Sequence, residues 1–262
     1  ALNNSKSNIA YISTPNNSHY IWAKMTLNAG MHTVIDKPAT IYLKETEDLL
    51  SIASNKLLLL SESTVYLFHP QFNTVKQLLK QEKSVPKHLT VNFSFPPMNS
   101  NNFRYKKELG GGAFLDTSPY AVSIGRFFFD TLPLQAFYIE NELLQNGLEL
   151  SYSLMLKYPS GKSLIGHFGF NTEYINKLNI LGDEISISID RAFTIPDSIE
   201  NIIDVKTKNK SSNIFSPKGN TFELYLTEVG KSIINKTFDD FYKAIHADAI
   251  ARELIYYKHI QK

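Results

Sequence analysis

The sequence predicts an α/β segment with an open parallel sheet, followed by an α+β segment with a larger, mostly antiparallel sheet. Short apolar runs alternate with helix-like stretches over the first 80 residues, the pattern of parallel strands joined by crossover helices. From residue 87 onward, alternating strands follow one another with turn residues between them. The 262 residues, 43% of them hydrophobic, suffice for one large core or two modest ones.

The first segment contains three predicted strand-helix units. Strands are expected at 9–14, 32–36 and 57–61, and helices at 19–28, 43–55 and 66–80. The third strand is a run of leucines, as expected where both faces of a sheet are covered. The first helix is expected to bury one apolar side, made of Ile21, Trp22, Met25 and Leu27. Residues 1–84 are predicted to form the first domain.

Residues 85–262 are predicted to form a second, sheet-rich domain that ends in a helix. Its strands are expected at 88–95, 134–140, 148–158, 163–170, 177–181 and 184–190. Turn residues at 159–162 and 182–183 predict hairpins at the two tightest connections. Helices are expected at 113–129 and 237–259. The Lys-, Asn- and Ser-rich stretch 206–220 is predicted to be an exposed loop, because it cannot bury much apolar area.

Charge and composition exclude several classes of function. The 27 basic and 25 acidic residues leave a net charge of +2 without long blocks of one sign, so no nucleic-acid partner is expected. With no cysteine there is no disulfide framework, Cys-ligated metal or Cys nucleophile, and we predict no metal site. No segment has the roughly 18 apolar residues of a membrane span. The first residues lack a signal-peptide pattern, so a cytoplasmic location is expected.

Polar residues stand at the carboxyl ends of the first two predicted strands. Thr14, Pro15 and Asn16 follow the first strand. Asp36 and Lys37 end the second, since the proline after them cannot donate to a strand ladder. A lone lysine at a strand end is usually a solvated charge. Two polar strand ends side by side instead favour a ligand crevice, because open parallel sheets bind ligands outside these ends.

A glycine triplet, Gly110 to Gly112, precedes a predicted helix that carries Asp116 and Tyr120. In a continuous helix these two residues share one face. Alternatively, Pro119 is the first helical residue and Asp116 lies just outside the helix. The triplet lacks the spacing of a dinucleotide-binding motif, so close backbone approach at a helix start is the simpler interpretation. Taken singly, Asp116 suits a helix start and Tyr120 a half-buried core position.

Five segments, in order and spacing, resemble the glucose-fructose oxidoreductase / inositol dehydrogenase family. They are Ile12–His19, Asp36–Ala39, Phe68–Phe72, Asn102–Tyr105 and Gly110–Tyr120. Each is weak alone, but together with the change from parallel to antiparallel patterning they make a specific match over essentially the whole chain. The resemblance implies an NAD(P)-dependent oxidoreductase of sugars, polyols or related alcohols. It also implies a doubly wound Rossmann sheet followed by a substrate domain.

The resemblance further implies roles for individual residues. Lys37 matches the family's lysine beside nicotinamide and substrate, and Asp116 matches an aspartate that helps hold the substrate. Tyr120 matches the tyrosine of the dihydrodiol dehydrogenase-like branch. We expect these three residues to be catalytic, with the Lys37 ammonium lowering the phenol pKa from its ordinary value of about 10. Residues expected to contact NAD or NADP are Thr14, Pro15, Asn16, His19, Lys37 and Arg104.

The chain departs from the family at its start. The glycine-rich phosphate loop and two strand-helix units that precede the first strand in the family have no counterpart here. We therefore expect a truncated form of the parent enzyme, inactive by itself, with an exposed sheet edge. The choice between NAD and NADP depends on the absent segment.

Two other functions stay open alongside the sugar oxidoreductase. One is a non-catalytic binding or assembly homologue that self-associates. The other is an NAD-dependent glycoside hydrolase, against which tyrosine in place of histidine at position 120 argues. In each case the partner is expected to be a small sugar-like molecule, and a homodimer or higher homo-oligomer is expected to form through the antiparallel sheet.

Overall fold

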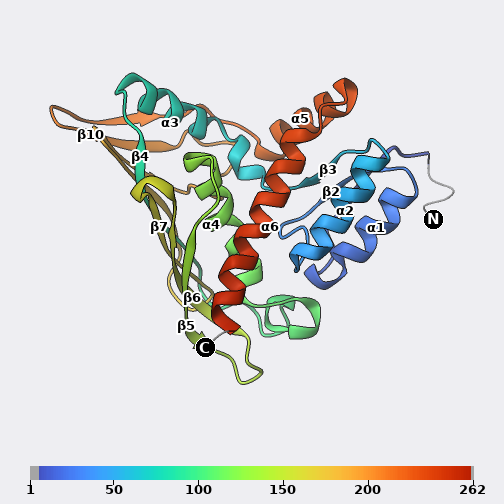
Figure 1. Ribbon diagram of the computed structural model, residues 1–262. Coiled ribbons are helices and arrows are strands. Elements are labelled where there is room, and N and C mark those ends of the chain that lie inside the picture. The colour runs from blue at the N-terminus through green and yellow to red at the C-terminus, as the bar shows by residue number, and fades with distance from the viewer. Residues whose placement is uncertain (1–5, 261–262) are drawn as a thin grey trace.

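The computed structural model describes residues 6–260, which form a small parallel sheet and a large mixed sheet with helices between and around them (Figure 1). The small sheet has the order β1-β2-β3, and both strand pairs are parallel. Its elements are β1 (Ile9–Ile12), α1 (His19–Asn28), β2 (His32–Ile35), α2 (Leu43–Asn55) and β3 (Leu60–Glu62). The predicted parallel strand-helix pattern is confirmed.

The large sheet has eight strands in the order β11-β10-β9-β8-β4-β7-β6-β5. All neighbours are antiparallel except β4 and β7, which run parallel. Its strands are β4 (Pro86–Ser94), β5 (Gln135–Leu143), β6 (Glu149–Lys157), β7 (Ser163–Gly169), β8 (Ile175–Gly182), β9 (Ile185–Asp190), β10 (Ile202–Thr207) and β11 (Ser211–Phe215). The mostly antiparallel second sheet is confirmed, including hairpins at both tight connections.

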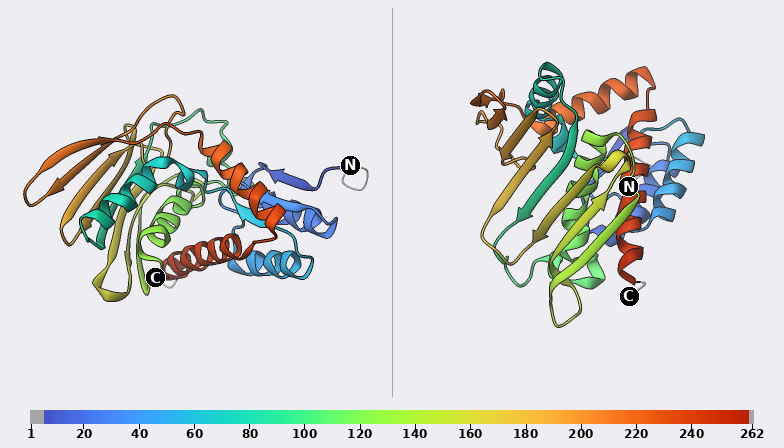
Figure 2. Two further views of the ribbon diagram at one scale, coloured as in Figure 1. Left: turned by 90° about the horizontal axis from the view of Figure 1, so that it is seen from above. Right: turned by 60° about the vertical axis from the view of Figure 1, so that its left-hand side comes forward.

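Helices α3 (Pro70–Gln81) and α4 (Ala113–Phe129) pack on one face of the large sheet and form the main core with it. The last two helices, α5 (Thr221–Asn235) and α6 (Asp239–Ile260), return to the small sheet (Figure 2). Helix α5 covers the sheet face opposite α1 and α2, through Tyr225 and Val229. None of the described helices is long and apolar enough to cross a membrane.

Helix α6 contacts both predicted domains, because it packs against α2 and β3 on one side and α4 and β5 on the other. The division at residue 84 stays a prediction. Residues 1–5 of the first predicted domain and 261–262 of the second lie outside the described residues.

Some predicted elements were wrong in extent or kind. Residues 206–220 are not one loop, since β10 ends in them, β11 lies wholly within them, and β10 buries Ile203 and Val205. Helix α5 was not predicted. Strand β3 begins at Leu60 rather than residue 57, because Leu57 turns the chain in a left-handed conformation after α2. The predicted helix 66–80 is a 3-10 turn at Val65–Phe68 followed by α3.

The predicted inner side of α1 was right for Leu27 and wrong for Ile21, Trp22 and Met25. The residues it buries are His19, Ala23, Thr26 and Leu27, at helical spacing from His19. Both ring nitrogens of His19 lie within hydrogen-bond distance of main-chain carbonyls, at 2.7 Å from Thr14 and 2.8 Å from Pro38. These contacts set the rotation of the helix and leave Ile21, Trp22 and Met25 exposed.

Two buried ion pairs fix α6 between the sheets. Arg126 of α4 binds Asp248 through two parallel bonds of 2.8 and 2.9 Å. Arg252 lies 3.4 Å from the carboxylate of Glu62 at the end of β3. Buried charges are tolerated only when they are paired in good geometry, so these contacts restrict how α6 can lie.

Two helical glycines provide a matched test of packing. A Cβ on Gly125 would overlap the hydroxyl of the fully buried Tyr158, whereas a Cβ on Gly230 would meet nothing within 4 Å. We predict that Gly125→Ala lowers the free energy of unfolding by about 1–3 kcal/mol through overpacking. Gly230→Ala should raise it by about 0.5–1 kcal/mol through helix propensity. Urea denaturation measures both, and equal effects of the two substitutions would contradict this packing.

Candidate active site

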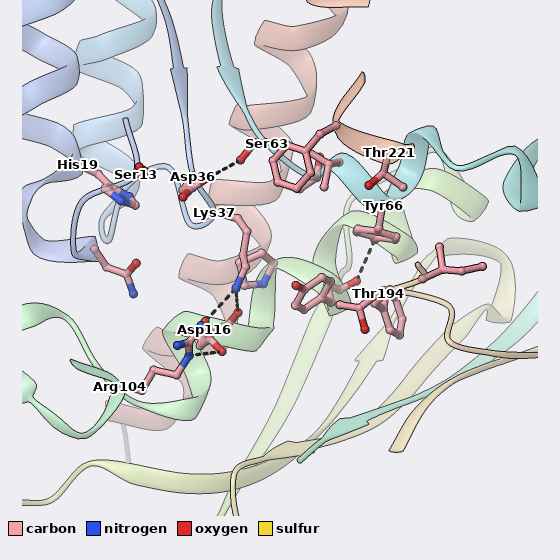
Figure 3. A pocket seen from close by; sticks show the side chains of 18 of the residues that line it. Ser13, His19, Asp36, Lys37, Ser63, Tyr66, Arg104, Asp116, Thr194 and Thr221 are labelled. Atoms are coloured by element: carbon pink, nitrogen blue, oxygen red, sulfur yellow. Dashed lines mark hydrogen bonds and ion pairs between the residues drawn. The ribbon is translucent and has the colours of Figure 1, made fainter. Parts of the chain in front are cut away.

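A cavity of about 610 Å³ opens at the carboxyl ends of the three strands of the small sheet (Figure 3). The small sheet contributes Ser13, Thr14, Asp36, Lys37 and Ser63. The opposite wall comes from α4 and from the chain that follows β9. Its residues are Asp116, Pro119, Tyr120, Phe193, Thr194, Ile195 and Asp197. The start of α5 closes one side with Asn220, Thr221 and Phe222.

Three charged residues meet in this cavity (Figure 3). The Lys37 ammonium donates to Asp116 Oδ1 at 2.9 Å and to the Asp116 main-chain carbonyl at 2.6 Å. Arg104 Nε lies 2.9 Å from the other carboxylate oxygen, Oδ2. Lys37 Nζ also lies 5.1 Å from the centroid of the Tyr120 ring. The residues expected to be catalytic are thus brought together, while their roles stay predictions.

The charge states of Lys37 and Asp116 support each other. Burial by itself would lower the pKa of Lys37, but the Asp116 carboxylate outweighs it, and the pKa is raised. Burial would likewise raise the pKa of Asp116, but Lys37 and then Arg104 outweigh it, and the pKa is lowered. Both groups are therefore charged at neutral pH.

Helix α4 runs unbroken through Pro119, so Asp116 lies inside the helix. The alternative in which the helix begins at Pro119 is wrong. A proline within a helix cannot donate to the carbonyl four residues earlier, and its ring crowds the preceding turn. That turn contains Asp116, whose carbonyl accepts from Lys37. Asp116 and Tyr120 both line the cavity, as their spacing predicted.

Tyr120 lies in an aromatic cluster with Tyr66, Phe93 and Phe193, whose ring centroids are 4.8–5.5 Å from its own. The expectation that the Tyr120 pKa falls below its ordinary value was wrong, although Lys37 acts on it in the expected direction. Burial raises this pKa, the Lys37 ammonium offsets only part of that effect, and the Asp116 carboxylate adds to it. The phenol therefore holds its proton at neutral pH. Within residues 6–260 its hydroxyl has no protein hydrogen-bond partner and is free to donate to a ligand.

The residues after β1 that were expected to contact the cofactor differ in whether their polar atoms already bind other parts of the protein. Thr14 faces the cavity. The Asn16 side chain lines it too, but donates to the Gly110 carbonyl at 2.8 Å. His19 also lines the cavity, but it is buried and both of its ring nitrogens lie at main-chain carbonyls. Pro15 does not line the cavity. The predicted cofactor contacts of these residues stay predictions, and Asn16 and His19 already have supporting roles in the protein itself.

A second polar group links the ends of all three strands. Ser63 donates to Asp36 at 3.0 Å, and the Tyr11 hydroxyl also donates to Asp36. Burial and the hydrogen bond to Asp36 raise the pKa of Tyr11 to about 12, so this phenol stays protonated. Sequence reasoning noted Asp36 but missed Ser63, although Ser63 follows a strand just as Thr14 does.

The glycine triplet serves close packing, as its simpler interpretation predicted. A Cβ on Gly110 would lie 2.9 Å from Asn16 Cβ, and one on Gly111 only 2.5 Å from the Arg104 carbonyl. Gly110 and Gly112 also have positive φ angles, of 73° and 105°. Glu149 of β6 accepts from the Phe114 N–H at the start of α4, at 2.9 Å. Within the described residues, no group of three His, Cys, Asp or Glu side chains is placed to hold a metal ion.

This fold and cavity are those of a two-part nicotinamide-dependent oxidoreductase. The family model for the NAD-binding Rossmann fold of the GFO/IDH/MocA oxidoreductases matches residues 1–64, and that for the GFO/IDH/MocA C-terminal domain matches residues 72–188. The chain belongs to the GFO/IDH/MocA family.

Several relatives are named as reductases or dehydrogenases of sugars, and others as dehydrogenases of an inositol or of a dihydrobenzenediol. The chain is 29% identical over 225 residues to a dTDP-3,4-didehydro-2,6-dideoxy-alpha-D-glucose 3-reductase of Saccharopolyspora spinosa. This match covers 85% of this chain and 68% of that protein. It is 29% identical over 163 residues to a D-xylose 1-dehydrogenase (NADP(+)) of Haloferax volcanii, covering 62% and 50%. The chain thus spans about half to two thirds of such relatives.

Solved structures show the same fold. A 3-ketoreductase from Actinomadura kijaniata, in complex with NADP and TDP-benzene, superimposes with a TM-score of 0.90 at 20% identity, covering 98% of this chain and 79% of that one. An aldose-aldose oxidoreductase from Caulobacter crescentus gives a TM-score of 0.88 at 16% identity, covering 99% and 79%.

The shared carboxylate generates a testable stability difference. We predict that Asp116→Asn lowers the free energy of unfolding by about 3 kcal/mol at pH 7, because two largely buried cations lose their partner. Since the pKa of Asp116 is lowered in the folded protein, this contribution is complete above its ordinary pKa and disappears as pH falls through the lowered value. Thermal or urea denaturation at several pH values measures it.

Asp48 provides the control, because its ion pair with Lys24 is well exposed. Asp48→Asn should change the free energy of unfolding by less than about 1 kcal/mol. Equal losses for Asp48→Asn and Asp116→Asn would contradict a special role for the buried carboxylate.

Proposed function

We propose that the protein reduces the carbonyl group of a keto sugar to an alcohol with a nicotinamide cofactor. The observation that carries this proposal is the buried Lys37–Asp116 ion pair beside a protonated Tyr120, at the carboxyl ends of parallel strands. The family and the names of the relatives support it, since these are sugar reductases and dehydrogenases. The same names give no support to a glycoside hydrolase or a non-catalytic homologue.

The proposed carbonyl reduction depends on which side chains carry protons at neutral pH. A bound reduced nicotinamide supplies the hydride that adds to the carbonyl carbon. The Tyr120 hydroxyl donates its proton to the carbonyl oxygen, and the resulting phenolate faces the Lys37 ammonium. Two N–H groups of Lys37 are held by Asp116, so the third is left to bind the substrate oxygen or the phenolate. Burial keeps the proton on the phenol at neutral pH, so the group is present in its donor form, which is why we propose reduction as the direction.

The strand ends fit the nicotinamide half of the cofactor. Ser13, Thr14, Asp36 and Lys37 offer hydroxyls, a carboxylate and an ammonium to a ribose and an amide. The printed sequence contains no Gly-x-Gly-x-x-Gly motif, so these residues do not include the usual pyrophosphate cradle. NADP is the form that we propose, because it occurs in the names of several relatives.

Tyr120 provides the test of this mechanism. We predict that Tyr120→Phe lowers kcat for carbonyl reduction by about 100- to 10,000-fold, through loss of the proton donor, with little change in cofactor binding. The assay follows oxidation of NADPH and of NADH with a panel of keto sugars, free and dTDP-linked. Cofactor binding is measured separately by thermal shift.

Tyr66→Phe is the matched control. Its ring contacts Tyr120, but its hydroxyl is bound to Ser123 at 2.7 Å, so turnover should change far less. Equal losses in the two variants would contradict proton donation by Tyr120. Absence of turnover with every keto sugar, despite cofactor binding, would contradict the proposed reaction.

A homo-oligomer formed through the large sheet is also part of the proposal. The sheet face opposite α3 and α4 carries an apolar row in register, Phe137, Met155 and Ile165, across β5, β6 and β7. All three side chains are exposed. Figure 2 shows helices on the other face of this sheet.

We also propose a cytoplasmic location, because the lack of cysteine agrees with a reducing compartment.

Ile165 lies at the end of the apolar row that is nearer the middle of the sheet. We predict that Ile165→Lys converts the oligomer to a monomer, because an unpaired ammonium would be buried between two sheets. Light scattering coupled to size-exclusion chromatography measures the mass. Ile234→Lys, at a highly exposed position on α5, should leave the mass unchanged. A monomeric unsubstituted protein would contradict self-association.

A further inference from the structure

We propose that Arg104 is a positioning residue, which fixes the Asp116 carboxylate so that the Lys37 ammonium stays beside Tyr120. Its guanidinium takes one carboxylate oxygen, Oδ2, and Lys37 takes the other. The catalytic consequence rests on the proposed function, whereas the electrostatic consequence for Asp116 does not. The expected contact of Arg104 with the cofactor stays a prediction, and its ion pair with Asp116 supports an additional role.

The geometry shows why the second cation matters. An ammonium is a point charge on a flexible stem and can bind either oxygen of a free carboxylate. With Oδ2 occupied by Arg104, Lys37 is restricted to Oδ1 and to the Asp116 carbonyl. Both of these atoms hold the ammonium at the face of α4 that carries Tyr120, 5.1 Å from the centroid of its ring.

Lys37, Arg104 and Asp116 form a cluster of two cations and one carboxylate, while Asp36 and Asp197 line other parts of the same cavity. The groups that act on Asp116 are Lys37 and Arg104, and the buried phenols of Tyr120 and Tyr152 face it from α4 and β6. Two cations and one carboxylate therefore surround a neutral phenol. The charges of Lys37 and Arg104 favour the phenolate that proton donation would leave behind, and the Asp116 carboxylate opposes it.

The glycine triplet holds Arg104 in place. The Arg104 carbonyl accepts from the Gly112 N–H at 2.8 Å, and its own N–H donates to the Asn102 side chain at 3.1 Å. A Cβ on Gly111 would approach the carbonyl carbon and oxygen of Arg104 to 2.8 and 2.5 Å. Main-chain atoms cannot rotate away as a side-chain tip does. Gly111 is therefore required for the chain to close around Arg104.

The same loop is attached to the cofactor side of the cavity. Asn16, which follows β1, donates to the Gly110 carbonyl at 2.8 Å in a buried contact. Asn17 donates to the Glu108 carbonyl. The loop that carries Arg104 is thereby fixed to the loop that carries Thr14, so Asp116 is oriented from both sides of the cavity.

The test replaces Arg104 by methionine and by lysine in the full chain. The Asp116 carboxyl is followed by NMR in protein labelled with ¹³C-aspartate, and its signal is identified by its absence from Asp116→Asn. Arg104→Met should raise the pKa of Asp116, because one cation is lost, and Arg104→Lys should restore part of the change. Lys107→Met, an exposed charge on the same loop, should leave that pKa in place.

Kinetics test the positioning role. Arg104→Met should lower kcat by about 10- to 100-fold with KM changed by less than about twofold, since the lost interaction acts on the reacting groups. Gly111→Ala removes no charge but displaces Arg104, so it should shift the Asp116 pKa and kcat in the same directions.

Each result decides a separate point. An Asp116 that titrates identically in Arg104→Met and in the unsubstituted protein would overturn the proposal. A shifted pKa with unchanged kcat would overturn the positioning role alone. If no variant turns over any keto sugar, the proposed function fails, and the NMR titration still decides whether Arg104 controls Asp116.

Discussion

The carboxylate of Asp116 is the interaction on which the candidate site depends. It is 6% exposed and shared by cations from two distant parts of the chain, Lys37 after β2 and Arg104 before α4. A buried carboxylate is costly unless both oxygens are satisfied, so the small sheet, the glycine-containing loop and α4 must all reach their final positions together. By binding both Lys37 and Arg104, Asp116 therefore also restricts how the small sheet lies against α4.

Directional charge contacts occur again where α6 joins the two sheets. Arg126 and Asp248 form a two-bond pair, and Arg252 reaches Glu62 at the end of β3. Apolar packing supplies most of the free energy of burial but tolerates small shifts, whereas bidentate pairs require fixed directions. The cavity lies between elements held by both kinds of contact. Helix α6, which contacts both β3 and α4, thus helps to place the walls of the cavity.

Much of this arrangement could be predicted from local patterns. The strand-helix units, the antiparallel strands and the Asp116–Tyr120 face are written in short-range periodicity and spacing. What local reasoning missed depends on distant partners. Helix α5 buries Tyr225 against β2 and β3, which precede it by more than 160 residues in the sequence. The rotation of α1 is set by His19 and two main-chain carbonyls. The sign of the Tyr120 pKa change likewise depends on how deeply tertiary packing buries the ring.

The return of α5 to the small sheet has a consequence for how the protein is made. The apolar face of Val34 and Leu59 emerges from the ribosome long before Tyr225 and Val229, which cover it. During that interval the nascent sheet presents an uncovered face and an incomplete cavity. Chains are synthesised at about 5–20 residues per second, so the interval lasts roughly ten seconds or more. Until the C-terminal helices arrive, apolar surface exposed in this way makes the nascent chain prone to aggregation.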